Sequence, residues 1–140
     1  MASPSSPSND QADVIRVLNE YYRAFSTLNV EAVLCYFHEP SFLIGPHGAF
    51  AATTHALLAT AITPAMEGFR VRLFGRTELS VRNLKSLSAT TTLVEGVARR
   101  YKHDGEGLDK AGVTYVLHRA DSVWKIAVLI VHDTDEVRYE

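Results

Sequence analysis

The segment Val123 to His132 constrains the fold of this chain most, because it is apolar on two opposite sides. Its interior divides by parity into two sets: Trp124, Ile126, Val128 and Ile130 on one side, and Ala127, Leu129 and Val131 on the other. Successive side chains of a β-strand point to opposite faces of the sheet. The segment therefore predicts a strand in a sheet whose two faces are both covered.

The N-terminal half of the chain has the apolar spacing and the capping residues of helices. Three helices are predicted. The first starts at Ser8, Asn9 or Asp10 and runs to about Leu28. The second follows Asn29 and ends at Pro40, and its buried side consists of Val30, Val33, Leu34 and Phe37. The third runs from Thr53 or Thr54 through Ile62, and Pro64 breaks or kinks it. A short hairpin, 42–44 with 49–51, lies between the second and third helices. Helices thus dominate the first half.

The second half has the composition and the turn signals of strands. The predicted strands are 69–74 leading into 77–84, 89–103, 112–121 and 123–132. Helices that come first and strands that come last are typical of an α+β domain with an antiparallel sheet. Three helices can cover one face of that sheet, and none is left for the other. We expect a second copy of the chain to cover it in a two-fold homodimer, with a closed barrel as the alternative.

Length and composition narrow the class of protein. The chain has 140 residues, which is one domain (10–140) after a Ser/Pro-rich tail (1–9) that we expect to be disordered. The net charge of −2 argues against a nucleic-acid partner. No apolar run approaches a membrane span, and no leader is evident, so a cytoplasmic location is expected. Cys35 is the single cysteine and, among apolar neighbours, is expected to be buried.

Three segments stand out beside this order of helices and strands: Tyr-Tyr-Arg-Ala-Phe (21–25), Val-Glu-Ala-Val-Leu-Cys-Tyr-Phe (30–37) and Ser-Val-Trp-Lys-Ile (122–126). With these segments the chain resembles the nuclear transport factor 2-like superfamily, which includes ketosteroid-isomerase-like and SnoaL-like proteins. The resemblance covers about residues 10–133. It implies three helices packed on a cone-shaped, strongly curved sheet (an α+β roll of the cystatin-like type), a mostly apolar pocket between them, and a dimer.

The resemblance to ketosteroid isomerases also implies where their catalytic groups would fall. Tyr21 matches their tyrosine that donates a hydrogen bond to the developing enolate. Their catalytic aspartate before a proline is matched by Gly45, followed by Pro46. Their second donor, a protonated aspartate, falls near Thr114 or Tyr115. Glycine accepts no proton, so isomerisation by that mechanism is not expected.

Seven residues are predicted to line the pocket: Tyr21, Phe25, Phe37, Arg99, Tyr115, Trp124 and His132. His132 shares parity with Trp124 and is the best acid–base candidate if the strand stays regular. Arg99 anchors a ligand anion if its face is concave, and otherwise belongs to the dimer contact or to solvent. Trp124 either contacts ligand or plugs the narrow end of the cone. Tyr21 either packs in the core or binds ligand.

The scattered histidines have no metal-site spacing, and no glycine-rich motif indicates a nucleotide, so neither a metal nor a cofactor is predicted. Two functions stay open. One is binding of a small apolar or aromatic molecule, with lyase, isomerase or hydrolase activity undecided. The other is a non-catalytic module for dimerisation or protein interaction.

Overall fold

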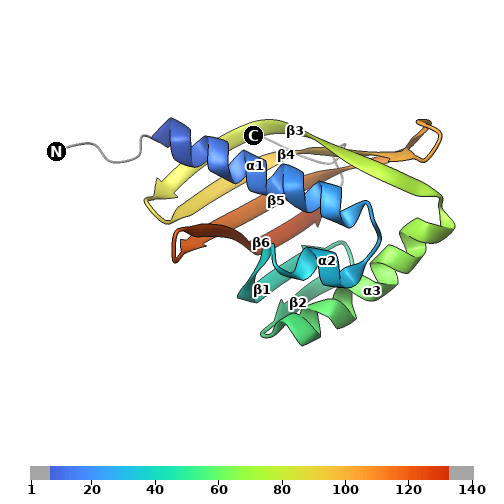
Figure 1. Ribbon diagram of the computed structural model, residues 1–140, viewed down its shortest axis with the longest axis horizontal. Coiled ribbons are helices and arrows are strands. Elements are labelled where there is room, and N and C mark those ends of the chain that lie inside the picture. Colours follow the sequence, from blue (N-terminus) through green and yellow to red (C-terminus); the bar gives the residue numbers. More distant parts are fainter. Residues whose placement is uncertain (1–6, 133–140) are drawn as a thin grey trace.

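A curved six-stranded sheet packs on three helices, all of which lie on its concave side (Figure 1). The computed structural model describes residues 7–132. The elements are α1 (Pro7–Phe25), α2 (Val30–Leu34), β1 (Phe37–Gly45), β2 (Gly48–Ala52), α3 (His55–Val71), β3 (Phe74–Ser88), β4 (Thr91–Lys102), β5 (Gly107–Ala120) and β6 (Val123–His132). The predicted α+β architecture is confirmed.

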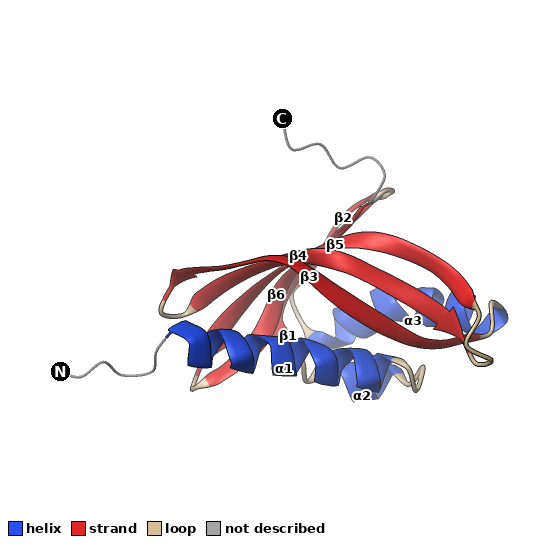
Figure 2. Ribbon diagram, turned by 90° about the horizontal axis from the view of Figure 1, so that it is seen from above, coloured by secondary structure: helices blue, strands red, loops and turns tan. Residues whose placement is uncertain are grey.

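The strand order is β2-β1-β6-β5-β4-β3, so the sheet is open, with β2 and β3 at its edges. A closed barrel is therefore wrong. β1 pairs with β6 in parallel, and the other neighbours pair antiparallel. Figure 2 shows that the convex face is bare: no element within residues 7–132 packs on it.

Two predicted N-caps fix the helix starts. The Asn29 side chain accepts a hydrogen bond from the Glu31 N–H at 3.1 Å and starts α2. Thr54 does the same for α3 through the Leu57 N–H, also at 3.1 Å. Such caps satisfy amides that have no partner inside the helix.

Two helices differ from the prediction at their ends. α1 begins at Pro7, inside the expected tail, and residues 1–6 lie outside the described residues. α3 continues through Pro64 to Val71, so that Phe69 lies on a helix rather than a strand. The hydrogen bond that Pro64 cannot make would go to the Thr60 carbonyl. Both residues are exposed, so water can take that carbonyl and the helix continues.

Phe37 and Cys35 also differ from their expected settings. Phe37 is fully buried, as expected, but it opens β1 instead of lying on α2, which ends at Leu34. Cys35 is the C-cap residue of α2 and is exposed, because the helix ends before its side chain can reach the core. No helix within residues 7–132 is long and apolar enough to cross a membrane.

A β-bulge in β6 decides which of its residues face the helices. Leu117 of β5 pairs with Ile126, whereas the neighbouring Val116 pairs with Val128, so Ala127 is an extra residue. A bulge of one residue reverses the parity of everything after it. Trp124 and Ile126 point inward before the bulge, and Leu129 and Val131 line the interior after it.

Candidate functional site

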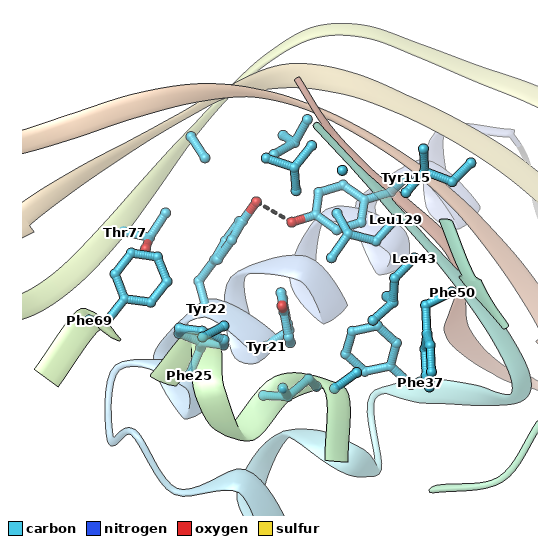
Figure 3. A pocket seen from close by; sticks show the side chains of 18 of the residues that line it. Tyr21, Tyr22, Phe25, Phe37, Leu43, Phe50, Phe69, Thr77, Tyr115 and Leu129 are labelled. Atoms are coloured by element: carbon cyan, nitrogen blue, oxygen red, sulfur yellow. Dashed lines mark hydrogen bonds between the residues drawn. The ribbon is translucent and has the colours of Figure 1, made fainter. Parts of the chain in front are cut away.

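A cavity of about 360 Å³ lies between the helices and the concave face of the sheet. Its walls come from α1, α3, the β1–β2 hairpin and the four remaining strands, and they are predominantly apolar (Figure 3). Its lining residues are Tyr21, Tyr22, Phe25, Phe37, Leu43, Ile44, Gly45, Gly48, Phe50, Ala61, Ile62, Ala65, Phe69, Thr77, Ala98, Arg100, Val113, Tyr115, Leu129 and Val131. The volume is near the lower end of the range for small-molecule sites.

Three tyrosines contribute hydroxyl groups to the lining of the cavity. The Tyr22 and Tyr115 hydroxyls are 2.5 Å apart and share a buried hydrogen bond between α1 and β5 (Figure 3). Only one of two hydroxyl hydrogens is used in such a pair, so the other stays available as a donor. Tyr21 packs edge-on against Tyr115 and Phe37.

The tyrosines are held as neutral hydrogen-bond donors. Burial raises the pKa of Tyr22 to about 12, against smaller opposing effects of the hydrogen bond with Tyr115 and of the Arg100 charge. Burial also raises the pKa values of Tyr21 and Tyr115 well above the ordinary value, because a phenolate would be poorly solvated there. At neutral pH their hydroxyls can donate hydrogen bonds to a ligand. They are not phenolates at that pH and therefore cannot take a proton from the ligand.

Among the lining residues that the structure describes, Arg100 is the one with an ionised side chain. Its Nη1 donates to one oxygen of Asp109 at 3.0 Å, and the Arg72 Nη2 donates to the other oxygen at 2.8 Å. The Arg100 guanidinium also lies 4.9 Å from the centre of the Phe69 ring. Partial burial raises the pKa of Asp109, but the hydrogen bonds from the two arginines outweigh this effect and leave the pKa below its ordinary value.

The lining residues include no aspartate, glutamate, histidine or cysteine from the described part of the chain. Within 7–132 there is also no group of three such residues that could hold a metal ion. The cavity can therefore bind and orient a molecule and stabilise negative charge on it. A general base that works near neutral pH is not among these lining groups.

Four of the seven residues predicted for the pocket line this cavity: Tyr21, Phe25, Phe37 and Tyr115. Arg99 does not, because β4 presents Ala98 and Arg100 to the interior. Arg99 lies on the convex face and donates to the Ser80 hydroxyl at 3.1 Å.

His132 and Trp124 also lie away from the cavity. His132 follows the bulge and therefore points to the convex side, where its ring covers Gly112 and its Nε2 is 3.5 Å from the Thr114 hydroxyl. Trp124 is buried, with the Arg119 guanidinium 5.5 Å from its ring centre, and Arg119 also pairs with Asp10 of α1. Trp124 thus packs in the core and is not one of the residues that line the cavity.

Sequence reasoning missed Arg100, Phe69 and the role of Tyr22 as the partner of Tyr115. The adjacent pair Arg99 and Arg100 was a signal, because one of two successive strand residues must face inward. Nothing in the sequence located the bulge or showed that α3 extends to Phe69.

The comparison with protein families agrees with this geometry. Residues 10–134 match the family described as NTF2-like protein (DUF6841). The chain belongs to this NTF2-like family. The predicted superfamily is thereby confirmed, and the match spans nearly the whole of the predicted domain. No curated protein matches the chain significantly.

Solved structures of other NTF2-like and related proteins share the fold at low identity. The protein Aln2 from a Streptomyces species has a TM-score of 0.77 at 12% identity, covering 95% of this chain and 96% of its own. A candidate calcium/calmodulin-dependent protein kinase II association domain from Xanthomonas campestris has 0.71 at 16%, covering 98% and 95%. A ketosteroid isomerase-like protein from Erwinia carotovora atroseptica has 0.66 at 17%, covering 88% and 95%. At these identities the similarity establishes the fold alone.

Proposed function

We propose that this NTF2-like protein binds a small apolar or aromatic molecule in the cavity between its helices and its sheet. The observation that carries the proposal is a cavity of about 360 Å³ with apolar walls and a few inward donors. Ligand sites have this combination, because apolar walls supply affinity and a few polar groups fix orientation. The lining groups described above favour binding over acid–base catalysis by the protein itself.

Filling the cavity tests the proposal. Ala61→Phe, on the cavity side of α3, should abolish binding of the neutral probe 2-naphthamide in calorimetry. Ala56→Phe is the matched control, because Ala56 is an exposed residue of the same helix outside the cavity lining. Equal binding by Ala61→Phe and wild type would contradict the proposal. So would a wild type that binds neither this amide nor the carboxylate of the same shape, 2-naphthoate, up to about 1 mM.

A second proposal concerns the convex face of the sheet, where a second copy of the chain would pack. Val128 of β6 pairs with Val116 of β5 on one side and with Phe42 of β1 on the other, and Phe42 is 39% exposed. Ile130 lies two residues further along β6, so these four apolar side chains form one patch. Apolar patches of this kind on a sheet are characteristic of protein contacts. The similarity to a candidate association domain is compatible with this role.

Light scattering tests the second proposal. Wild type should have the mass of a dimer at micromolar concentration, and Ile130→Lys should shift it to the monomer, because a lysine there would be buried without a partner. Ser86→Lys, at an exposed position of β3, should leave the mass unchanged. A monomeric wild-type protein would rule the dimer out.

A further inference from the structure

We infer that the cavity recognises a carboxylate-bearing ligand, and that Arg100 binds its carboxylate. This inference rests on the proposed function and names the class of ligand for the same cavity. Arg100 is the one ionised side chain among the lining residues of the described chain, and none of these lining residues is acidic. A ligand anion is therefore the charge that the cavity accommodates.

The charge on Arg100 is only partly compensated by the protein. Asp109 binds two arginines, with one oxygen on Arg100 at 3.0 Å and the other on Arg72 at 2.8 Å. The three side chains together carry a net charge of +1. Asp109 engages Arg100 through Nη1 alone. The guanidinium has five N–H donors in a planar fork, so donors remain for a second carboxylate.

Arg100 is held in one orientation for this contact. Its guanidinium lies over the Phe69 ring at 4.9 Å, and its side chain is 17% exposed. An arginine fixed by a ring and by an ion pair loses little freedom when it binds a ligand. Low exposure also strengthens its attraction to an anion relative to a surface arginine.

The remaining lining groups match the two ends of such a ligand. Figure 3 shows Phe69 and Thr77 at one side of the cavity and Phe37, Leu43 and Phe50 at the other. The carboxylate would lie at the Phe69 side, beside Arg100, and the apolar body at the other side. The neutral tyrosine hydroxyls lie between these ends and can donate to the ligand but do not repel it.

Matched probes of one shape test this inference by calorimetry: 2-naphthoate, the neutral 2-naphthamide and the cationic 2-naphthylmethylamine. Wild type should bind 2-naphthoate roughly tenfold or more tightly than the amide, as a buried hydrogen bond to a charged group predicts. The amine should bind weakest. Arg100→Met should lose that preference and keep the affinity for the amide, since Asp109 retains Arg72 as its partner.

Arg99→Met is the control, because Arg99 is the adjacent residue on the opposite face; it should bind all three probes as wild type does. If Arg100→Met does not fold, as judged by circular dichroism, Arg100→Gln removes the charge but keeps an amide donor for Asp109 and should show the same loss. Equal affinity of wild type for naphthoate and amide, or full naphthoate affinity in both Arg100 variants, would overturn the inference while leaving the proposed function standing. Binding of none of the three probes would overturn both.

Discussion

The hydrogen bond between Tyr22 and Tyr115 makes the clearest prediction about stability. Tyr115 is 1% exposed and Tyr22 8%, and their hydroxyls are 2.5 Å apart. Changing one tyrosine to phenylalanine leaves the other hydroxyl buried without its partner, which destabilises a protein by about 1–3 kcal/mol. Tyr22→Phe should be the more damaging change, because it strands the more deeply buried hydroxyl.

The double variant separates this hydrogen bond from general packing. With both hydroxyls gone, two rings of nearly the same shape pack together and no polar atom of the pair is left unsatisfied. The double variant should therefore lose at least about 1 kcal/mol less than the sum of the single variants.

Urea denaturation at one fixed protein concentration measures these free energies, provided the slope with urea does not change between variants. Tyr36→Phe is the control, because the described structure gives the Tyr36 hydroxyl no hydrogen bond; it should change stability by less than about 0.5 kcal/mol. Strictly additive single changes, or single changes that are each negligible, would refute the claim that the two hydroxyls are a buried pair.

Three further predictions follow from the described contacts. The folded state favours neutral Tyr22, because its pKa there is raised to about 12. Its contribution to stability is therefore complete below the unfolded pKa of about 10 and is lost as the pH rises toward 12. Over this range the urea midpoint of Tyr22→Phe should fall less steeply than that of wild type, and parallel curves would contradict this. The folded state favours ionised Asp109, so its contribution to stability is complete above the unfolded pKa of about 3.9 and is lost as the pH falls through the lower folded pKa. Asp109→Asn should therefore lose less stability than wild type on acidification below pH ~4. If the free energy of unfolding falls equally with pH in both proteins, the ion pairs with Arg72 and Arg100 are contradicted. Gly96→Ala should destabilise the protein by about 1–3 kcal/mol, because a Cβ there would collide with the Ser80 carbonyl oxygen. Gly68→Ala in α3 has open space and should stabilise it by up to about 1 kcal/mol. Thermal unfolding of both variants checks this pair, and equal shifts of the melting temperature would contradict it.

The local features of the fold were predictable from short stretches of sequence. Asn29, and Thr53 or Thr54, are predictable N-caps, because capping depends only on a side chain that can accept a hydrogen bond from an amide within three residues. Asn29 and Thr54 make these hydrogen bonds. The range of β6 was predicted because its apolar run is bounded by a turn and is too short for a helix. Tyr21 and Tyr115 were named because each lies on an apolar stripe that must face the core.

The site residues that were missed depend on pairing between distant strands. Arg99 is a predicted pocket residue because it shares parity with Val97 and Tyr101. Both faces of β4 carry apolar residues, so alternation alone does not say which face is concave. His132 was placed inward because the parity of β6 was assumed regular, and the bulge at Ala127 exists only in the pairing with β5. Phe69 reaches the cavity because α3 tolerates Pro64 on its exposed side, which depends on how that helix packs.

A crystal structure of the protein grown with 2-naphthoate tests whether the cavity is a binding site that ends at Arg100. We expect electron density for the naphthyl group between α3 and the concave face, with the carboxylate within hydrogen-bond distance of the Arg100 guanidinium and wild-type packing elsewhere. A cavity collapsed onto its own side chains, with Phe69 or the tyrosines filling the space and no ligand density, would contradict it.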